Sequence, residues 1–433
     1  MRVLMLSWRD LGNPRGGGSE RYVHRVAAGL VAGGDEVTVR TAAYPGAPAD
    51  EVVDGVRHLR RGSADSVFPT ALADLARGRL GHPDVVVDCQ NGMPFGSRLG
   101  TRAPVVVLVH HVHREQWPVA VGPLAGRVGW AIESRVAPRL YRRSRYVAVS
   151  HATRRELGTL GIGEHRIAVV HNGLDPVPAT GPRSPALSLV VLSRLVPHKQ
   201  VEHALLALAR LRATRPELTL TVIGDGYWAP RLHAAAAELG VADAVRLVGH
   251  VDDDEKHRLL AAGWVHLCPS VKEGWGLAIL EAAQHGVPTV AYAAAGGTAD
   301  SVLDGRTGLL ADDLDGLVAA TARLLDDDAL RDRLGGAARV RAGDFTWADT
   351  TREFRAVLAS AVPVLHQGLV DGSRVGRGLL GELDHADGGA PGHSEPEHER
   401  QSHADQSPHR SLPGCPEIPR PRGGHTVPAG NDL

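Results

Sequence analysis

Short apolar runs alternate with longer amphipathic stretches along this chain of 433 residues. The first run, residues 3–7, is followed by a glycine-rich loop and then by apolar residues at helical spacing, which predicts strand, loop and helix. Because the runs are continuously apolar, they predict strands buried on both faces of a parallel sheet. Further runs of this kind lie at 36–40, 84–88, 104–110, 145–149 and 167–171.

A second cycle follows a stretch rich in Pro, Gly and Ser at residues 175–186, which is typical of a linker. The pattern therefore predicts an α/β protein with two doubly wound, Rossmann-like domains that face each other across a cleft. The strands predicted here are 187–193, 218–224, 245–249, 264–270 and 288–292, and the clearest helices are 201–212 and 277–285.

Five segments are expected along the chain. The last segment contains no aromatic residue and is rich in Pro, Gly, His and Ser, so we predict that it is disordered. The predicted segments are an N-terminal domain at 1–178, a linker at 179–186, a C-terminal domain at 187–343, a closing helix at 344–362 and a tail at 363–433.

The near-zero net charge and the isolated cysteines argue against two classes of protein, nucleic-acid-binding proteins and zinc proteins. Lys and Arg number 48 against 49 Asp and Glu, so no overall basic field is present to bind nucleic acid. Cys89, Cys268 and Cys415 are isolated, which indicates a reducing compartment and argues against a zinc site. Residues 1–8 hold too short an apolar run for a signal peptide or a membrane span. We therefore expect a cytoplasmic protein.

Two cations follow the first strand of the second cycle. Arg194 and Lys199 lie in the predicted strand-to-helix loop, where they would clamp a diphosphate and stabilise it as a leaving group. The alternative is ordinary solvated surface charge. Lysine is rare in this arginine-rich chain, which contains only Lys199, Lys256 and Lys272, so a lysine indicates that a compact ammonium is needed.

The segment KEGWGLAILEAAQHGVP at 272–288 combines two carboxylates with a glycine loop and a helix start. Glu273 and Glu281 would accept hydrogen bonds from sugar or ribose hydroxyls, while the helix N-terminus receives a diphosphate. The alternative is that Glu273 is a helix-end acid and Glu281 lies on a solvated face.

Several motifs in order resemble the retaining family 4 glycosyltransferases, which have the GT-B fold. The resemblance covers about residues 1–362. In the first domain the motifs are GGGSERYVHRVAAGLVAGGDEVTV at 16–39, AVSHATRREL at 148–157 and VVHNGLD at 169–175. In the second domain they are SRLVPHK at 193–199, IGDG at 223–226, the Glu273-to-Glu281 motif and AAGGTADSVLDGRTGLL at 294–310.

The resemblance implies transfer of a glycosyl group from a nucleotide-diphosphate sugar, with retained anomeric configuration and with no metal or further cofactor. The resemblance also implies roles for individual residues: Arg194 and Lys199 would hold the phosphates, Glu281 the ribose, Glu273 the sugar hydroxyls, and the amides of Gly276 and Leu277 the phosphate.

In the first domain the resemblance implies that Gly17 and Gly18 bind the donor as part of a loop that closes over the reaction centre, where only glycine lets the backbone approach closely. The family's histidine falls best on His110. His111 and His113 are near enough to remain alternatives, and a plain core or loop histidine is a further one.

Two positions depart from the family pattern. His198, Lys199 and Gln200 stand where the family often has Glu-Lys-Gly, and Asp300 stands where the family has Glu. These changes leave the donor base and sugar open. The acidic runs Asp252–Asp254 and Asp326–Asp328 are expected to cap helices rather than to bind a metal.

The segment 114–145 mixes Trp117, Trp130 and Ile132 with seven arginines, which include Arg135, Arg139, Arg142, Arg143 and Arg145. Such a segment either lies on anionic lipid at the inner face of the membrane, as a peripheral contact, or packs as a core helix with a solvated basic face.

The acceptor is a saccharide, a lipid-linked molecule or a small metabolite, and no residue is assigned to it. Two other functions fit the same architecture. One is a nucleotide-sugar epimerase, and the other is a noncatalytic sugar-binding scaffold.

Overall fold

The computed structural model describes residues 1–178 and 181–362. Residues 179–180 of the predicted linker and the whole predicted tail, 363–433, lie outside the described residues, so the prediction of a disordered tail stays a prediction.

The first half of the chain forms an eight-stranded sheet in the order β3-β4-β2-β1-β5-β6-β7-β8. All of its neighbouring strands run parallel except the pair β3 and β4. The strands are β1 (Arg2–Leu6), β2 (Glu36–Thr41), β3 (Asp50–Val53), β4 (Val56–Arg60), β5 (Val85–Gln90), β6 (Val105–Val109), β7 (Arg145–Ala148) and β8 (Ile167–Val169).

Strands β3 and β4 were not predicted, although the sequence carries a signal for them. They form an antiparallel hairpin around Asp54 and Gly55, which both have positive φ angles of 51° and 77°. An Asp-Gly pair between two short strands is a strong hairpin signal. Val52 is 66% exposed, so this edge hairpin lacks the apolar run that marks the buried strands.

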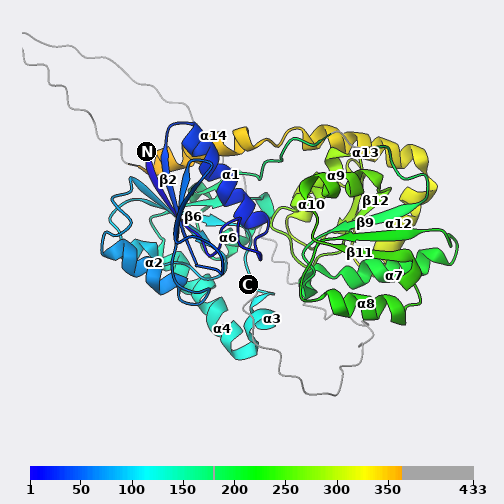
Figure 1. Cartoon of the computed structure of the whole chain (residues 1–433), viewed down its shortest axis with the longest axis horizontal. Coiled ribbons are helices and arrows are strands. Elements are labelled where there is room, and N and C mark those ends of the chain that lie inside the picture. Colours follow the sequence, from blue (N-terminus) through cyan, green and yellow to red (C-terminus); the bar gives the residue numbers. More distant parts are fainter. Residues whose placement is uncertain (179–180, 363–433) are drawn as a thin grey trace, which may run out of the picture. The chain divides into compact units, whose positions relative to one another are not determined.

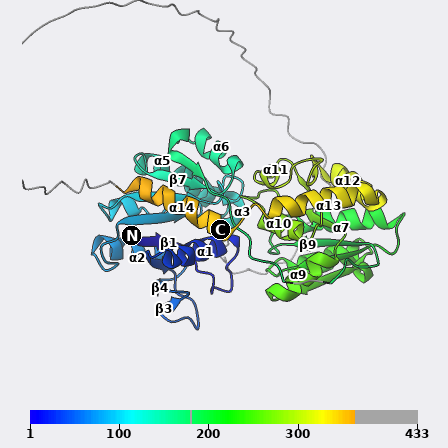
Figure 2. The same cartoon turned by 90° about the horizontal axis from the view of Figure 1, so that it is seen from above.

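The continuously apolar strands are buried on both faces, as predicted. Val3 and Met5 of β1 belong to one core cluster, whereas Leu4 and Leu6 belong to another. Because successive side chains of a strand point to opposite faces, the two clusters lie on opposite sides of the sheet, and helices cover it (Figure 2). The helical elements are α1 (Gly18–Ala32), α2 (Val67–Ala76), η1 (Ser97–Leu99), α3 (Trp117–Val121), α4 (Pro123–Ala131), η2 (Ile132–Val136), α5 (Ala137–Leu140), α6 (His151–Thr159) and η3 (Glu164–Arg166).

The second half forms a six-stranded sheet in the order β11-β10-β9-β12-β13-β14, with every pair parallel. Its outer strand β14 was not predicted, although its residues stand in a family motif. The predicted strand 264–270 is shorter than expected. The strands are β9 (Ser188–Leu192), β10 (Thr219–Ile223), β11 (Val245–Gly249), β12 (Val265–Cys268), β13 (Thr289–Tyr292) and β14 (Gly308–Ala311).

Helices alternate with the strands of the second half along the chain. The predicted closing helix is α14 (Trp347–Ala361), which returns to pack on α1, β6 and β7 of the first half (Figure 1). The other helical elements are η4 (Pro197–Lys199), α7 (Val201–Arg212), α8 (Ala229–Glu238), η5 (Ala242–Ala244), α9 (Asp253–Ala262), α10 (Leu277–Gln284), α11 (Thr298–Ser301), α12 (Leu314–Asp326) and α13 (Asp328–Ala342).

The two halves share one core cluster. Trp275 and Leu280, which belong to the loop before α10 and to α10 itself, join the cluster on one face of the first sheet. The described residues of the two halves accordingly form one compact unit. The predicted boundaries between the domains stay predictions.

In the arginine-flanked segment 114–145 the two tryptophans pack inward, as the core-helix alternative expects. Trp117 is 3% exposed and donates its indole N–H to Glu133 at 2.6 Å, and Trp130 packs against a core cluster. The tryptophans therefore do not form an outward face. Among the described residues, no helix is both long and apolar enough to span a bilayer.

Candidate functional site

The predicted phosphate-binding cations lie at the carboxyl end of β9. Lys199 ends the short helix η4, and its Nζ lies 2.6 Å from Oε1 of Glu273. Arg194 is exposed and forms no ion pair with any residue in the described ranges, so its guanidinium is available to an anion. Ligands of doubly wound sheets bind at this edge.

Glu273 lies in the loop between β12 and α10 and is anchored through a single oxygen. Its Oε1 accepts from Lys199 and, at 2.7 Å, from the hydroxyl of Ser270. Burial would raise the pKa of Glu273, but the charge of Lys199 and these two hydrogen bonds lower it. The carboxylate is therefore ionised at neutral pH, and Oε2 accepts no hydrogen bond from the described part of the chain.

The N-terminus of α10 is open. Gly276 precedes this helix with a left-handed backbone, φ 83°, and no side chain caps the helix. A Cβ at Gly276 would lie 2.8 Å from Cδ1 of Ile279, so both φ and space favour glycine here. The N–H of Ile279 donates to the carbonyl of Gly276, whereas those of Leu277 and Ala278 have no acceptor among the described residues and remain available to an anion.

Glu281 lies one turn further along α10 than Leu277, and it is not a solvated face residue. Its side chain is 15% exposed, and its Oε1 lies 2.8 Å from Nζ of Lys256. Arg21 of α1 approaches the same oxygen at 3.7 Å.

Glycines of the first half meet the predicted donor residues of the second. A Cβ at Gly17 would lie 3.6 Å from Nε of Arg194, and a Cβ at Gly18 would lie 3.1 Å from Cδ1 of Leu277. A Cβ at Gly274 would come within 2.3 Å of the carbonyl oxygen of His110. The structure thus brings together residues from the two halves of the chain, the most distant of these pairs being Gly18 and Leu277.

The three candidate histidines after β6 are distinguished by their partners. Nδ1 of His113 lies 3.2 Å from Glu133, and Nε2 of His111 lies 2.8 Å from Gln116. His110 is 7% exposed, and its Nε2 is buried with no hydrogen-bond partner in the described residues. Burial, with the nearby His113 adding to it, lowers the pKa of His110 to about 3. His110 is therefore neutral at pH 7, with a ring nitrogen left for a ligand.

Three other buried polar atoms without a described hydrogen-bond partner lie at or just beyond the carboxyl ends of strands. They are Oε1 of Gln90, Oδ1 of Asn172 and Oγ of Ser193, which end or follow β5, β8 and β9. A buried polar group without a partner in the free protein is a candidate ligand contact. Sequence reasoning missed these residues, although their positions directly after predicted strands were a usable signal.

The two departures from the family pattern have local explanations. Gln200 has a left-handed φ of 46° at the start of α7, so the glycine geometry is kept without glycine. The carboxylate of Asp300 accepts at 2.7 Å from the N–H of Ala152, at the N-terminus of α6. Asp300 therefore links the two halves.

Both acidic runs cap helices, as predicted. Asp252 accepts from the N–H of Glu255 at the start of α9, and Asp327 accepts from that of Leu330 at the start of α13. Within residues 1–178 and 181–362, no group of three or more His, Cys, Asp or Glu side chains is arranged to hold a metal ion.

Two family models match the chain. The model described as Glycosyltransferase Family 4 matches residues 16–177, and the model described as Glycosyl transferases group 1 matches residues 179–341. The roles of the individual site residues are not tested by these matches and stay predictions.

Curated relatives and solved structures agree with the family models. The chain is 32% identical to a glycogen synthase of Mycobacterium tuberculosis over 386 residues, which span 80% of this chain and 92% of that protein. It is also 32% identical over 395 residues to a D-inositol 3-phosphate glycosyltransferase of Nocardioides sp., across 78% of this chain and 84% of that protein.

The solved structures show the fold. Sucrose-phosphate synthase of Thermosynechococcus elongatus has a TM-score of 0.70 at 20% identity and covers 83% of this chain and 99% of its own. The Anabaena protein HepE in complex with UDP-glucose has a TM-score of 0.66 at 19% identity and covers 83% of this chain and 100% of its own. With its two doubly wound sheets and its matches in both halves, the chain belongs to the family 4 (group 1) glycosyltransferases of the GT-B fold.

Proposed function

We propose that this glycosyltransferase moves a sugar from a nucleotide-diphosphate sugar to an acceptor hydroxyl, with retained anomeric configuration and without a divalent metal. The observation that supports the donor class best is the convergence of Arg194, Lys199 and the open N-terminus of α10 beside Glu273. Two cations and oriented amides are suited to a diphosphate, and an ionised carboxylate is suited to sugar hydroxyls.

Retention follows if the acceptor attacks from the face that the diphosphate leaves. The bond between the anomeric carbon and the phosphate oxygen breaks, the acceptor oxygen bonds to that carbon, and the departing phosphate takes the hydroxyl proton. Arg194 and Lys199 would stabilise the negative charge that develops on the leaving group. Proton NMR of the product, which distinguishes α from β linkages by their coupling constants, tests this step; an inverted product would overturn it.

His110 would act as a neutral hydrogen-bond partner of the donor sugar. Because its pKa is lowered, the imidazole of His110 is neutral at physiological pH and supplies no positive charge.

Glu273→Gln should lower kcat, because the contact of Glu273 with the sugar strengthens as positive charge develops on the sugar ring. Glu281→Gln should mainly raise KM. Equal kinetic effects of the two substitutions would overturn this division of roles.

Metal independence is proposed because the cations and amides already supply positive charge to the diphosphate. Turnover should survive dialysis against EDTA. Loss of turnover that magnesium restores would show instead that a divalent ion bridges the phosphates.

A binding assay can identify the base of the nucleotide donor. The structural neighbour HepE was solved with UDP-glucose, which supports a UDP sugar as the first donor to test. Thermal unfolding with UDP, GDP and ADP should single out one base, since a ligand at a hundred times its Kd adds about 2.7 kcal/mol. Incubation of the matching sugar nucleotide without acceptor distinguishes transfer from epimerisation, because an epimerase would isomerise the sugar.

Two acceptors are suggested by the names of the relatives above, a glycogen chain and D-inositol 3-phosphate. A lipid-linked acceptor is a third. Product analysis with each acceptor class decides among them.

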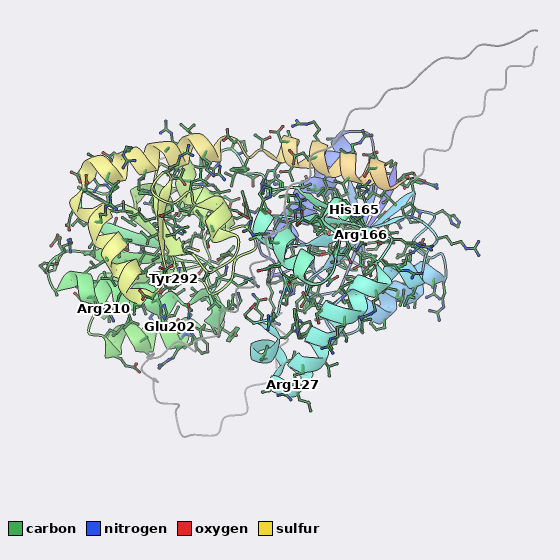
Figure 3. All side chains as sticks on the ribbon, turned by 180° about the vertical axis from the view of Figure 1, so that it is seen from behind. Arg127, His165, Arg166, Glu202, Arg210 and Tyr292 are labelled. Carbon is green, nitrogen blue, oxygen red and sulfur yellow. The ribbon has the colours of Figure 1, made fainter. Side chains whose placement is uncertain are left out.

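The exposed face of α4 and η2 combines apolar and cationic side chains, which would suit an enzyme that takes a lipid-linked acceptor. Leu124, Val128 and Val136 are 77%, 57% and 52% exposed, and Arg127 and Arg135 are exposed beside them; Arg127 projects outward from α4 (Figure 3). We propose that this face contacts a bilayer with anionic headgroups. Sedimentation with phosphatidylglycerol vesicles but not with phosphatidylcholine vesicles is expected. Leu124→Asp should abolish this binding, and absence of binding by the unaltered chain would remove the membrane contact while leaving the transfer reaction in place.

A further inference from the structure

All three lysines of this arginine-rich chain pair with glutamates around the predicted site. Lys199 contacts Glu273, Lys256 contacts Glu281, and Lys272 contacts Glu156. The first of these pairs belongs to the leaving-group machinery already proposed. The second pair involves a lysine that neither the motifs nor the comparisons assign to any role.

The pair of Lys256 and Glu281 repeats the geometry of the pair of Lys199 and Glu273. In both pairs the ammonium binds Oε1 of the glutamate, at 2.6 Å for Glu273 and 2.8 Å for Glu281. No described residue donates a hydrogen bond to Oε2 of either glutamate. Each carboxylate is therefore held at one oxygen and left open at the other.

Lys256 is itself fixed. Its side chain is 10% exposed, and its Nζ also lies 2.7 Å from Oδ1 of Asp253 at the start of α9. Burial alone would raise the pKa of Asp253, but Lys256 and Arg21 lower it to about 2. The ammonium therefore sits between two carboxylates on α9 and α10.

We infer that Lys256 is a positioning residue for donor binding: it holds Oε1 of Glu281 so that Oε2 accepts a hydrogen bond from a ribose hydroxyl of the nucleotide. A compact ammonium suits this task. The planar guanidinium of an arginine would tend to pair with both carboxylate oxygens at once and so occupy the one that the ribose needs. The inference rests on the proposed function, in which Glu281 binds the donor ribose.

The test compares two ligands rather than one. Whichever of UDP, GDP and ADP binds the unaltered chain is titrated by calorimetry alongside its 2′,3′-dideoxy form, which lacks the hydroxyls that Glu281 would bind. The unaltered chain should prefer the ribose form by about 10-fold or more, as expected for a hydrogen bond to a charged group. Lys256→Met should lose most of this preference while binding the dideoxy form as the unaltered chain does.

Two further variants make the test specific. Glu281→Gln should lose the same preference, and Lys256→Met combined with Glu281→Gln should be no weaker than Glu281→Gln alone, because both substitutions remove one interaction. If Lys256→Met does not fold, Lys256→Arg keeps the positive charge and should still lose the preference. Arg258→Ala, on the exposed side of α9, is the matched control and should change neither affinity.

The outcomes separate the inference from the proposed function. If no nucleoside diphosphate binds the unaltered chain, the proposed donor class fails. If the unaltered chain prefers the ribose form and a folded Lys256 variant keeps that preference, the positioning role is wrong and the donor assignment stands. A purely structural role would weaken both ligands equally.

Discussion

Replacing Lys199 with Met should remove the ammonium that lowers the pKa of Glu273 and leave the burial that raises it. The side chains of Lys199 and Glu273 are only 16% and 14% exposed. Removing one partner of such a pair leaves a desolvated charge, which costs about 3 kcal/mol or more. With an unfolding entropy of about 2.1 cal/mol/K per residue over the described chain, this corresponds to a fall in Tm of about 4 °C at pH 7.5.

The loss should depend on pH in a defined direction. In the unaltered chain the pKa of Glu273 is lowered, so its contribution to stability is present above the pKa of the unfolded carboxyl and is lost as the pH falls through the folded value. In Lys199→Met the burial remains without the ammonium, and the pKa rises. The variant therefore takes up a proton as the pH falls, and the difference in Tm between the two proteins should shrink from pH 7.5 towards pH 4.

The assay is thermal unfolding followed by circular dichroism at several pH values, together with initial rates at pH 7.5. Turnover should fall about 10²-fold or more, because a preorganised charge on the leaving group is lost. The control, Lys199→Met with Glu273→Gln, carries no buried charge and should recover most of the lost stability while staying inactive. A pH-independent loss of stability, or near-normal turnover in Lys199→Met, would refute the reasoning.

Three other substitutions test local features. Gly274→Ala places a Cβ 2.3 Å from the carbonyl oxygen of His110 and should lower kcat/KM by about 10²-fold through misplacement of the site by roughly 1 Å, whereas Gly158→Ala, with nothing within 4 Å, should leave kcat/KM unchanged. His110→Phe should reduce the loss of stability in acid. The pKa of His110 is lowered to about 3 in the folded protein, so between pH 6.5 and 3 only the unfolded chain binds a proton at this residue. The unfolding free energy lost between pH 7.5 and 5, measured by urea unfolding, should therefore be smaller in the variant by about 2 kcal/mol. Gln200→Gly should relieve the left-handed φ of 46° and raise the unfolding free energy by about 1 kcal/mol; an unchanged urea midpoint would show that the loop absorbs the strain.

Much of the fold could be predicted because burial on both faces leaves a direct record in the sequence. A strand such as β6, which is buried at every position, is continuously apolar, and the predicted helix 201–212 has the observed bounds of α7. The hairpin of β3 and β4 could not be found in the same way, because β3 lies at a sheet edge, where exposure relaxes the apolar pattern. The strand β14 is apolar and mostly buried but only four residues long, so its apolar run is too short to stand out.

Part of the candidate site could also be predicted from local sequence patterns. The sequence by itself determined which residue types follow the strands of the second half: the cations Arg194 and Lys199, the glutamates Glu273 and Glu281, and the glycine before α10. Their spacing is local, because each group follows one strand or opens one helix, and parallel strands bring their carboxyl ends to one edge.

Only the tertiary structure decided which partners these groups have. That Lys256 holds Oε1 of Glu281 and that Gly274 touches the carbonyl of His110 depends on contacts between segments far apart in the chain. Local sequence patterns carry no record of such contacts, because a lysine that anchors a carboxylate and a lysine in solvent have the same neighbours in sequence. The same holds for the three histidines after β6: only the fold shows that Nε2 of His110 is buried without a partner among the described residues, and the role of His110 stays a prediction.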